Sequence, residues 1–402
     1  MLLLLALNAV SQWARAIIFY VVDFKVEPSA EAERLFMNVD LGFDEAQYGV
    51  LASIGFAALF SVTSLAAGSI VERVDARSLL VGTAGLWSVA TIFQGAAQGF
   101  GGLLGARMAA GIGQAFGNPA SYTILSRLYP PDKLASVNGL YASGVYVGGG
   151  LAALSILVDS AVGWRQLCIF AGGVGLVVAA GTQLRLPPLP ALPPAAADGA
   201  PSPSAAPSST DERSKLLAPK GAAPPAEGGV LASLGALLSE PTVSLLLLAS
   251  AFRFLAGFTI GVWIVPYYRE AYPGAIGAQF ALVKAAVNGL AGSASATGGG
   301  VLADRLAKRD PRFLQWVPAA GSLLGIPMWI ATIQAESLEA SLGFLFLECL
   351  AEPRTREAPR PRRTPRSALG ARTTHAAPAM RVRPCRTGTS SPSAGSGRRW
   401  PG

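Results

Sequence analysis

Long apolar runs limit this chain's fold more than any other feature. Ten of them lie at about residues 2–22, 47–71, 79–98, 102–127, 136–158, 165–184, 243–268, 276–302, 314–333 and 337–351. About 20 apolar residues cross a bilayer as a helix, and helices satisfy their own backbone hydrogen bonds there. Only 14% of the residues are charged, against roughly a quarter in soluble domains. The sequence therefore predicts an all-α polytopic membrane protein.

The first and last runs allow other interpretations. The first could be a signal peptide, but it lacks a basic leading region, contains Arg15 and has no clear small-residue cleavage site. The last run is short and contains Glu339 and Glu348, so we expect a buried or incomplete span there.

A Pro/Ala/Ser-rich stretch divides the spans into six and about four. It has no apolar period, which favours a disordered cytoplasmic linker. The expected organisation is an N-terminal six-helix bundle (1–184), the linker (185–240), a partial C-terminal bundle of about four helices (241–352) and a disordered Arg/Pro-rich tail (353–402).

The basic charge of the chain resides in its tail. Residues 353–402 hold twelve arginines and one acid, a charge of +11, so residues 1–352 carry a net charge of 8 − 11 = −3. Because the basic charge is confined to the tail, it argues against a nucleic-acid partner for the whole chain. Segment 23–46 is acidic, whereas the loops after the second, fourth and eighth spans are basic. The positive-inside rule then places those loops and the N-terminus in the cytoplasm, with 23–46 outside.

The sequence shows few signs of catalysis or of cofactor binding. The single histidine, His375, lies in the tail, and Cys168, Cys349 and Cys385 show no metal or redox spacing. No phosphate-binding loop, paired carboxylates or nucleophile set is visible. We expect no enzyme activity, metal or cofactor.

Basic residues inside the spans mark the candidate site, because a charge at membrane depth usually faces a pathway or the bundle interior. Spacings of three, four and seven residues place polar neighbours on the same helix faces. The expected substrate-binding residues are Arg15, Arg107, Gln114, Asn118, Arg253, Lys284 and Asn288. With almost no acid in the complete spans, these bases predict an anionic substrate. Two alternatives stay open: Arg107 reaching to the interface, and polar contacts that serve helix packing alone.

An internal repeat links the two halves. Gly68-Ser-Ile-Val-Glu72-Arg73 follows the second span, and Gly300-Val-Leu-Ala-Asp304-Arg305 follows the eighth. Both resemble the loop signature G-x-x-x-D-R-x-G-R-K of the major facilitator superfamily, although Glu72 replaces the Asp of the signature in the first copy. The resemblance implies a conformational role for Gly68, Glu72, Arg73, Gly300, Asp304 and Arg305.

Two further motifs extend the resemblance. Arg107-Met-Ala-Ala-Gly111-Ile-Gly113 and Gly163-Trp164-Arg165 are similar to family patterns in the fourth and sixth spans. The Spinster-like branch of lipid and sphingolipid transporters looks nearest. That branch carries acids, thought to couple transport to protons, where this chain has Ala14 and Gln114, so proton coupling at these positions is not implied.

The sequence therefore predicts a secondary-active or facilitative transporter that works by alternating access between two helical halves. We expect a monomer in a bilayer that carries an anionic small molecule or lipid. The alternatives are a non-transporting membrane scaffold or receptor, and an inactive truncated transporter, since the family has twelve spans.

Overall fold

The structure, a computed structural model, describes residues 1–130, 133–187, 235, 238–307, 309–310 and 313–351. Over these residues the chain forms helices and no strands, which confirms the predicted all-α fold. Most of the predicted linker 185–240 and the tail 353–402 lie outside the described residues.

The N-terminal helices comprise long helices and short connecting ones. The long ones are α1 (Leu2–Ala16), α5 (Gly55–Arg73), α6 (Ala76–Ala96), α7 (Phe100–Ala115), α8 (Gly117–Leu128), α9 (Leu134–Ala142), α10 (Gly144–Val162) and α11 (Trp164–Arg185). The short ones are η1 (Ile17–Phe19), α2 (Ala30–Leu35), α3 (Met37–Leu41), α4 (Glu45–Gly49) and the π-helical turn η2 (Val50–Ile54).

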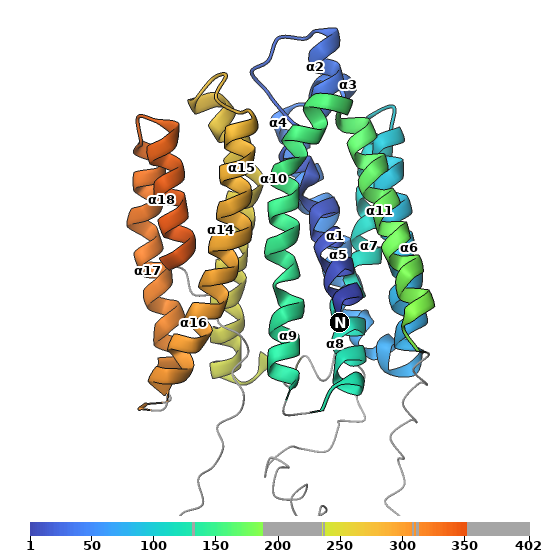
Figure 1. The fold of residues 1–402 in the computed structure, drawn as a ribbon, viewed down its shortest axis with the longest axis vertical. Helices are drawn as coiled ribbons and strands as arrows, with labels where there is room; N and C mark the ends of the chain where they lie inside the picture. Colours follow the sequence, from blue (N-terminus) through green and yellow to red (C-terminus); the bar gives the residue numbers. More distant parts are fainter. Residues whose placement is uncertain (131–132, 188–234, 236–237, 308, 311–312, 352–402) are drawn as a thin grey trace, which may run out of the picture. The chain divides into compact units, whose positions relative to one another are not determined.

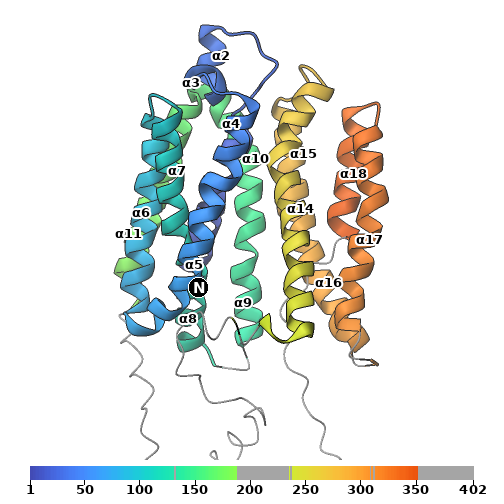
Figure 2. The same cartoon turned by 180° about the vertical axis from the view of Figure 1, so that it is seen from behind.

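The C-terminal helices follow the linker. They are α14 (Pro241–Ala271), α15 (Ala278–Ala286), the π-helical turn η3 (Val287–Ala291), α16 (Gly292–Ala307), α17 (Phe313–Gln334) and α18 (Leu338–Ala351). Figures 1 and 2 show them gathered beside the N-terminal helices. α10 packs on α15 and η3, and α14 packs on η1, so the two groups share an interface.

All ten predicted runs are largely helical, but five of them are divided between successive helices. The first becomes α1 and η1, the second α4, η2 and α5, the fourth α7 and α8, the fifth α9 and α10, and the eighth α15, η3 and α16. Among the described residues, six segments have the length and apolarity to cross a membrane. They are Leu2–Phe19, Glu45–Gly68, Ala76–Ala96, Ser136–Val162, Trp164–Arg185 and Val243–Ala271.

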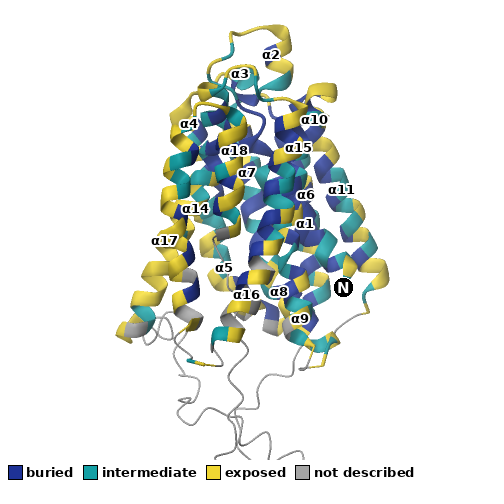
Figure 3. Cartoon of the chain, turned by 60° about the vertical axis from the view of Figure 1, so that its left-hand side comes forward, coloured by how far each residue is buried: buried dark blue, intermediate teal, exposed yellow. Residues whose placement is uncertain are grey.

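Burial differs sharply between helices, as Figure 3 shows. In the apolar segment of α1, 56% of the residues are buried, against 6% in that of α14. α1 is therefore a central helix, whereas α14 turns side chains such as Leu245 and Phe252 outward. An exposed surface this apolar suits the hydrocarbon of a bilayer rather than water.

Glycines of α10 allow its close approach to α1. A Cβ on Gly144 would lie 2.9 Å from Nδ2 of Asn8, and one on Gly148 would collide with the carbonyl oxygen of Ala9. Small residues at such contacts let membrane helices pack backbone to backbone. The glycine run of the fifth span therefore sets the position of α10 against the polar face of α1.

Candidate functional site

Two arginines from different helices meet beside an aromatic ring. Arg15 of α1 donates from Nε to Oε1 of Gln114 at 3.0 Å, and Arg107 of α7 donates to the Arg15 carbonyl oxygen at 2.7 Å. The Cζ atoms of Arg15 and Arg107 lie 4.6 and 5.2 Å from the ring centre of Phe56. We call Arg15, Arg107 and Gln114 the arginine cluster.

Arg107 does not reach to the membrane interface, since the residue is only 1% exposed. Its Nε atom is buried without a hydrogen-bond partner. Neither arginine of the cluster forms an ion pair with an acid in the part of the chain that the structure describes. Two neighbouring cations are thus held by amide and carbonyl oxygens and aromatic faces, all without formal charge.

Helix geometry explains why these residues meet. Asn8, Gln12 and Arg15 lie on one face of α1 and line the same crevice as Gln114 and Asn118. The glycines after Arg107 bring α7 close to its neighbours: a Cβ on Gly111 would lie 2.8 Å from the carbonyl oxygen of Phe56, and one on Gly113 would lie 2.9 Å from that of Thr83.

The crevice beside the arginine cluster is nearly closed. It holds about 20 Å³, room for roughly one water molecule. Asn118 accepts a hydrogen bond from the hydroxyl of Tyr141 at 3.1 Å, and Asn8 donates to the Tyr141 carbonyl oxygen at 2.9 Å. Sequence reasoning missed Tyr141 because a tyrosine in an apolar span gives no signal of its own.

The C-terminal helices enclose a larger cavity of about 370 Å³, within the range typical of small-molecule sites. Arg253 of α14, Lys284 of α15 and Asn288 of η3 line it, together with the apolar surface of Trp329. Glu348 of α18 also lines it and is only 7% exposed. We call this space the C-terminal cavity.

Glu348 corrects one expectation from the sequence. The sequence predicts almost no buried acid in the complete spans, but Asp159, just past the fifth run, and Glu348, in the short last run, are both buried. Glu348 interacts electrostatically with Lys284 in the C-terminal cavity. Because the run 337–351 is short, the sequence predicts an incomplete span there and does not place Glu348 among the site residues.

The seven predicted site residues form two groups rather than one. Arg15, Arg107, Gln114 and Asn118 belong to the N-terminal helices, whereas Arg253, Lys284 and Asn288 line the C-terminal cavity. Asn288 also contacts the N-terminal helices, because its Nδ2 donates to the Gly149 carbonyl oxygen and the Tyr20 hydroxyl, both at 3.1 Å. The π-helical turn that presents Asn288 is a feature often found at functional sites.

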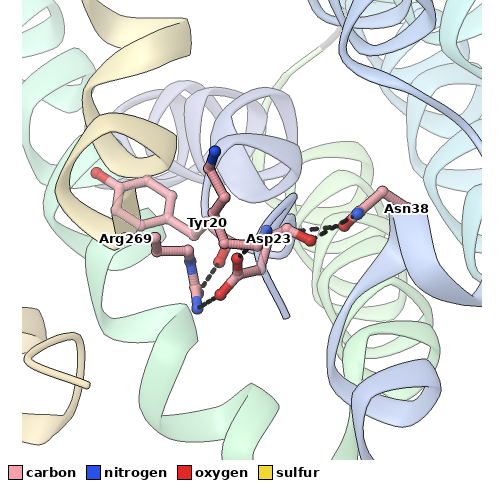
Figure 4. A network of polar contacts seen from close by, with 5 residues as sticks. Tyr20, Asp23, Asn38 and Arg269 are labelled. Atoms are coloured by element: carbon pink, nitrogen blue, oxygen red, sulfur yellow. Dashed lines mark hydrogen bonds and ion pairs between the residues drawn. The ribbon is translucent and has the colours of Figure 1, made fainter. Parts of the chain in front are cut away.

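A polar network that the sequence did not reveal joins the N-terminal and C-terminal helices at the end bearing segment 23–46 (Figure 4). We call it the outer end because the loop charges predict that this segment faces outward. Arg269 of α14 pairs with Asp23 at 3.3 Å and donates to the carbonyl oxygen of Tyr20 at 3.0 Å. Asn38 fixes Asp23 by two hydrogen bonds with its backbone, of 2.9 and 2.7 Å. Arg269 also stacks on the ring of Phe36 at 4.6 Å.

Other contacts extend this outer interface. Lys25 pairs with Glu270 at 2.9 Å, and this hydrogen bond raises the pKa of the exposed Lys25 ammonium. The Tyr48 hydroxyl donates to the carbonyl oxygen of Val262 at 2.8 Å, and its ring meets Trp263 edge to face at 5.2 Å. The outer ends of the two groups are therefore in direct contact.

The Gly-Trp-Arg motif serves packing at the outer end. Trp164 donates from Nε1 to Asp40 at 3.0 Å, and Arg165 pairs with the same carboxylate at 2.8 Å. Gly163 has φ of 87°, in the left-handed region that glycine tolerates. The motif thus fastens α11 to α3.

The repeated loops gave mixed results. A Cβ on Gly68 would meet nothing within 4 Å, so this conformation does not need glycine there for close packing. Arg73 and Arg305 are exposed. The structure does not describe the side chains of Glu72 and Asp304 or the burial of Gly300. Asp75, at the second glycine position of the motif, caps α6 by accepting from the Ser78 backbone at 2.9 Å.

Comparison with known proteins gives relatives among transporters. An MFS-type efflux pump of Mycolicibacterium smegmatis is 27% identical over 330 residues, which cover 80% of this chain and 68% of the pump. A D-galactonate transporter of Escherichia coli O6:H1 is 32% identical over 139 residues, 34% of this chain and 32% of the transporter.

A solved structure shares the fold. A bacterial homologue of the human lysosomal transporter Spinster, in an inward-facing and unoccupied conformation, superposes with a TM-score of 0.65 at 22% identity. The match covers 87% of this chain and 71% of the homologue. The expected likeness to Spinster-like transporters is confirmed at the level of fold.

The apolar helices and the transporter relatives make this chain an integral multi-pass membrane protein. The family profile described as Major Facilitator Superfamily matches residues 4–350, which include the arginine cluster, the C-terminal cavity and the outer interface. The chain therefore belongs to the Major Facilitator Superfamily.

Proposed function

We propose that this protein is a secondary-active or facilitative transporter that moves an anionic small molecule or lipid by alternating access. The observation that carries the proposal is the arginine cluster, in which two adjacent guanidinium groups meet no acid in the described ion pairs. Cations removed from water need a counter-charge, and a carboxylate or phosphate of the substrate would supply it.

The C-terminal cavity supports the same proposal from the other half. Arg253 and Lys284 line it beside apolar surface, a combination that suits an anion with an apolar portion. The cavity holds about 370 Å³, whereas the crevice beside the arginine cluster holds about 20 Å³. Rocking of the two halves would have to open that crevice before one substrate could contact both sets of bases.

The outer interface fits the closed side of such a cycle. Arg269, Tyr48 and Lys25 hold the outer ends together through polar contacts that can break without unfolding a helix. The superposed Spinster homologue is described as inward-facing, a state of the same kind. Alternating access requires this interface to open in the other half of the cycle.

Two other functions compete with transport. A scaffold or receptor could keep the fold without moving a substrate, and a chain with a transporter fold could be inactive. The paired guanidiniums favour transport, because a scaffold has no need for uncompensated charge at membrane depth. The similarity to a D-galactonate transporter, whose named substrate is a carboxylate, adds support for an anion.

Uptake into proteoliposomes tests the proposal. The probes are D-galactonate and lysophosphatidate, a carboxylate and a phosphate-bearing lipid, with D-galactose as a probe without the carboxylate. We expect the protein to move at least one anion and not D-galactose. Arg15→Gln should reduce apparent affinity by about 10- to 100-fold, since a charged hydrogen bond contributes about 1.5–3 kcal/mol.

Arg185→Gln is the matched control, because Arg185 is exposed at the end of α11. Equal uptake by the Arg15 and Arg185 variants would exclude the arginine cluster from substrate binding. Absence of uptake for every anion, with a correctly folded protein, would favour the scaffold or the inactive transporter.

A further inference from the structure

A second, smaller cavity adjoins the C-terminal cavity. It holds about 150 Å³ and lies where α10 faces η3, α16 and α18. We call this space the side pocket. Asn288 and Cys349 line both the side pocket and the C-terminal cavity, so the two spaces meet at these residues.

One helix face leads from the C-terminal cavity to the side pocket. Its residues are four, four and three positions apart, a spacing that keeps side chains on one side of a helix: Lys284, Asn288, Gly292 and Ser295. Lys284 lines the C-terminal cavity, whereas Gly292 and Ser295 line the side pocket. Four residues advance a helix by about 6 Å. A small molecule that lies along this face would therefore reach both spaces at once.

The two spaces differ in charge. Arg253, Lys284 and Glu348 line the C-terminal cavity, which gives it a formal charge of 2 − 1 = +1. Lys284 is 6% exposed, and its ammonium group makes no hydrogen bond or ion pair within the part of the chain that the structure describes. The described residues that line the side pocket carry no charge. The anionic end of a substrate therefore fits the C-terminal cavity, and an uncharged portion fits the side pocket.

Tyr146 of α10 gives the side pocket an aromatic wall. A Cβ on Gly292 would collide with the Tyr146 ring, so the missing side chain at Gly292 makes room for this ring against α16. Asn288 is held at the junction of the two spaces by its hydrogen bonds to Gly149 and Tyr20. A cavity of about 150 Å³ can hold one benzene molecule, and aromatic rings pack favourably on one another. The size and the wall of the side pocket both suit a single aromatic ring.

We propose that the side pocket is a binding subsite for an uncharged aromatic ring, and that the substrate is an aryl-bearing monoanion whose anionic group lies beside Lys284. The inference rests on the proposed transport of an anion and adds the part of the substrate that the basic residues do not explain. The formal charge of +1 in the C-terminal cavity is balanced by a monoanion but exceeded by a dianion. The ring adds affinity through burial of apolar surface.

Equilibrium binding to the purified full-length chain tests the side pocket. The probe is radiolabelled phenylbutyrate, and the competitors are butyrate, which lacks the ring, and phenylbutanol, which lacks the charge. We expect phenylbutyrate to bind about 10- to 100-fold more tightly than butyrate, the gain from burying a phenyl group. Phenylbutanol should bind about tenfold or more weakly than phenylbutyrate, because it makes no charged hydrogen bond with Lys284.

Val145→Trp places bulk in the side pocket at a residue that lines it but is 42% exposed. It should weaken phenylbutyrate binding by about tenfold or more and leave butyrate binding unchanged. Val147→Trp is the matched control, since Val147 is 44% exposed on the same helix and lies outside the side-pocket lining. Val145→Ala should instead improve the binding of naphthylbutyrate relative to phenylbutyrate by about fourfold. Size-exclusion chromatography checks that each variant is folded.

Three results would overturn the proposal. The ring subsite is rejected if the folded parent protein shows no saturable binding of phenylbutyrate, or binds butyrate equally well. In the second case the proposed anion transport still stands. Unchanged phenylbutyrate binding in Val145→Trp, with no gain for naphthylbutyrate in Val145→Ala, would place the ring elsewhere. Equally tight binding of phenylbutanol would instead reject the anionic substrate and leave the side pocket as a ring site.

Discussion

Gln114→Glu tests whether the arginine cluster attracts negative charge. The Gln114 amide oxygen accepts a hydrogen bond from Arg15 at 3.0 Å, and Arg107 donates to the Arg15 carbonyl oxygen at 2.7 Å. The substitution changes one amide to a carboxylate of nearly the same shape. It therefore places an internal anion where we propose that the substrate anion binds.

The expected stabilisation is what remains of the electrostatic attraction after the new charge has been removed from water. A carboxylate 3.0 Å from a guanidinium gains about 5 kcal/mol at an effective dielectric constant of about 20. Desolvation of the new charge costs several kcal/mol. Because the site already holds two cations, we expect a net gain of about 1–2 kcal/mol, similar to the step from a neutral to a charge-assisted hydrogen bond.

Thermal unfolding of the purified protein, followed by tryptophan fluorescence with and without lysophosphatidate, measures both effects. Gln114→Glu should raise the midpoint without anion and weaken anion binding by about tenfold or more, since the internal carboxylate competes for the same cations. Gln114→Leu should lower the midpoint, because loss of an acceptor from a partly buried donor costs about 1–3 kcal/mol.

The same chemical change at an exposed position, Gln166→Glu, should alter neither property. The reasoning fails if Gln114→Glu binds the anion as tightly as the parent protein does. It also fails if the variant unfolds at a lower temperature than Gln114→Leu, because the cluster would then not attract negative charge.

Three further tests, two of them with a matched control substitution, address packing and the C-terminal cavity. Asp40→Asn should lower the unfolding midpoint by an amount equivalent to about 1 kcal/mol, because it removes the ion pair with Arg165. Lys25→Gln is the control: it breaks a more exposed ion pair and should leave the midpoint unchanged. Gly148→Val should sharply reduce the folded yield in size-exclusion chromatography, because its Cβ would collide with α1. Gly68→Ala is the control: open space surrounds Gly68, so the folded yield should stay unchanged. Lys284→Met should weaken anion uptake in proteoliposomes by about tenfold if the C-terminal cavity binds the substrate.

The family motifs divide by physical role. Gly111 and Gly113 permit close helix approach, and Trp164 with Arg165 fastens α11 to the outer loop. These residues preserve the scaffold, and none of them forms the two groups of predicted site residues. Arg107 is different, since its guanidinium lies in the arginine cluster itself.

The sequence alone determined the helices and the faces they present. Apolar length predicted the ten helical runs, because lipid leaves the backbone few alternatives to a helix. The spacing of Asn8, Gln12 and Arg15 correctly predicted one polar face, since residues three, four and seven apart share a side of a helix. The loop repeat and the Arg107 motif predicted the superfamily, which the family profile confirms.

Only the tertiary structure decided which faces meet. Periodicity fixes a side chain's direction on its own helix but not the neighbour it contacts. Arg269 and Asp23 are 246 residues apart in sequence and pair because α14 packs beside η1 at the outer end. Helix packing also places Glu348 and Lys284 in the same cavity. Arg107 is buried because Gly111 lets α7 approach α5 closely. Such pairings depend on the packing of whole helices, which short stretches of sequence do not encode.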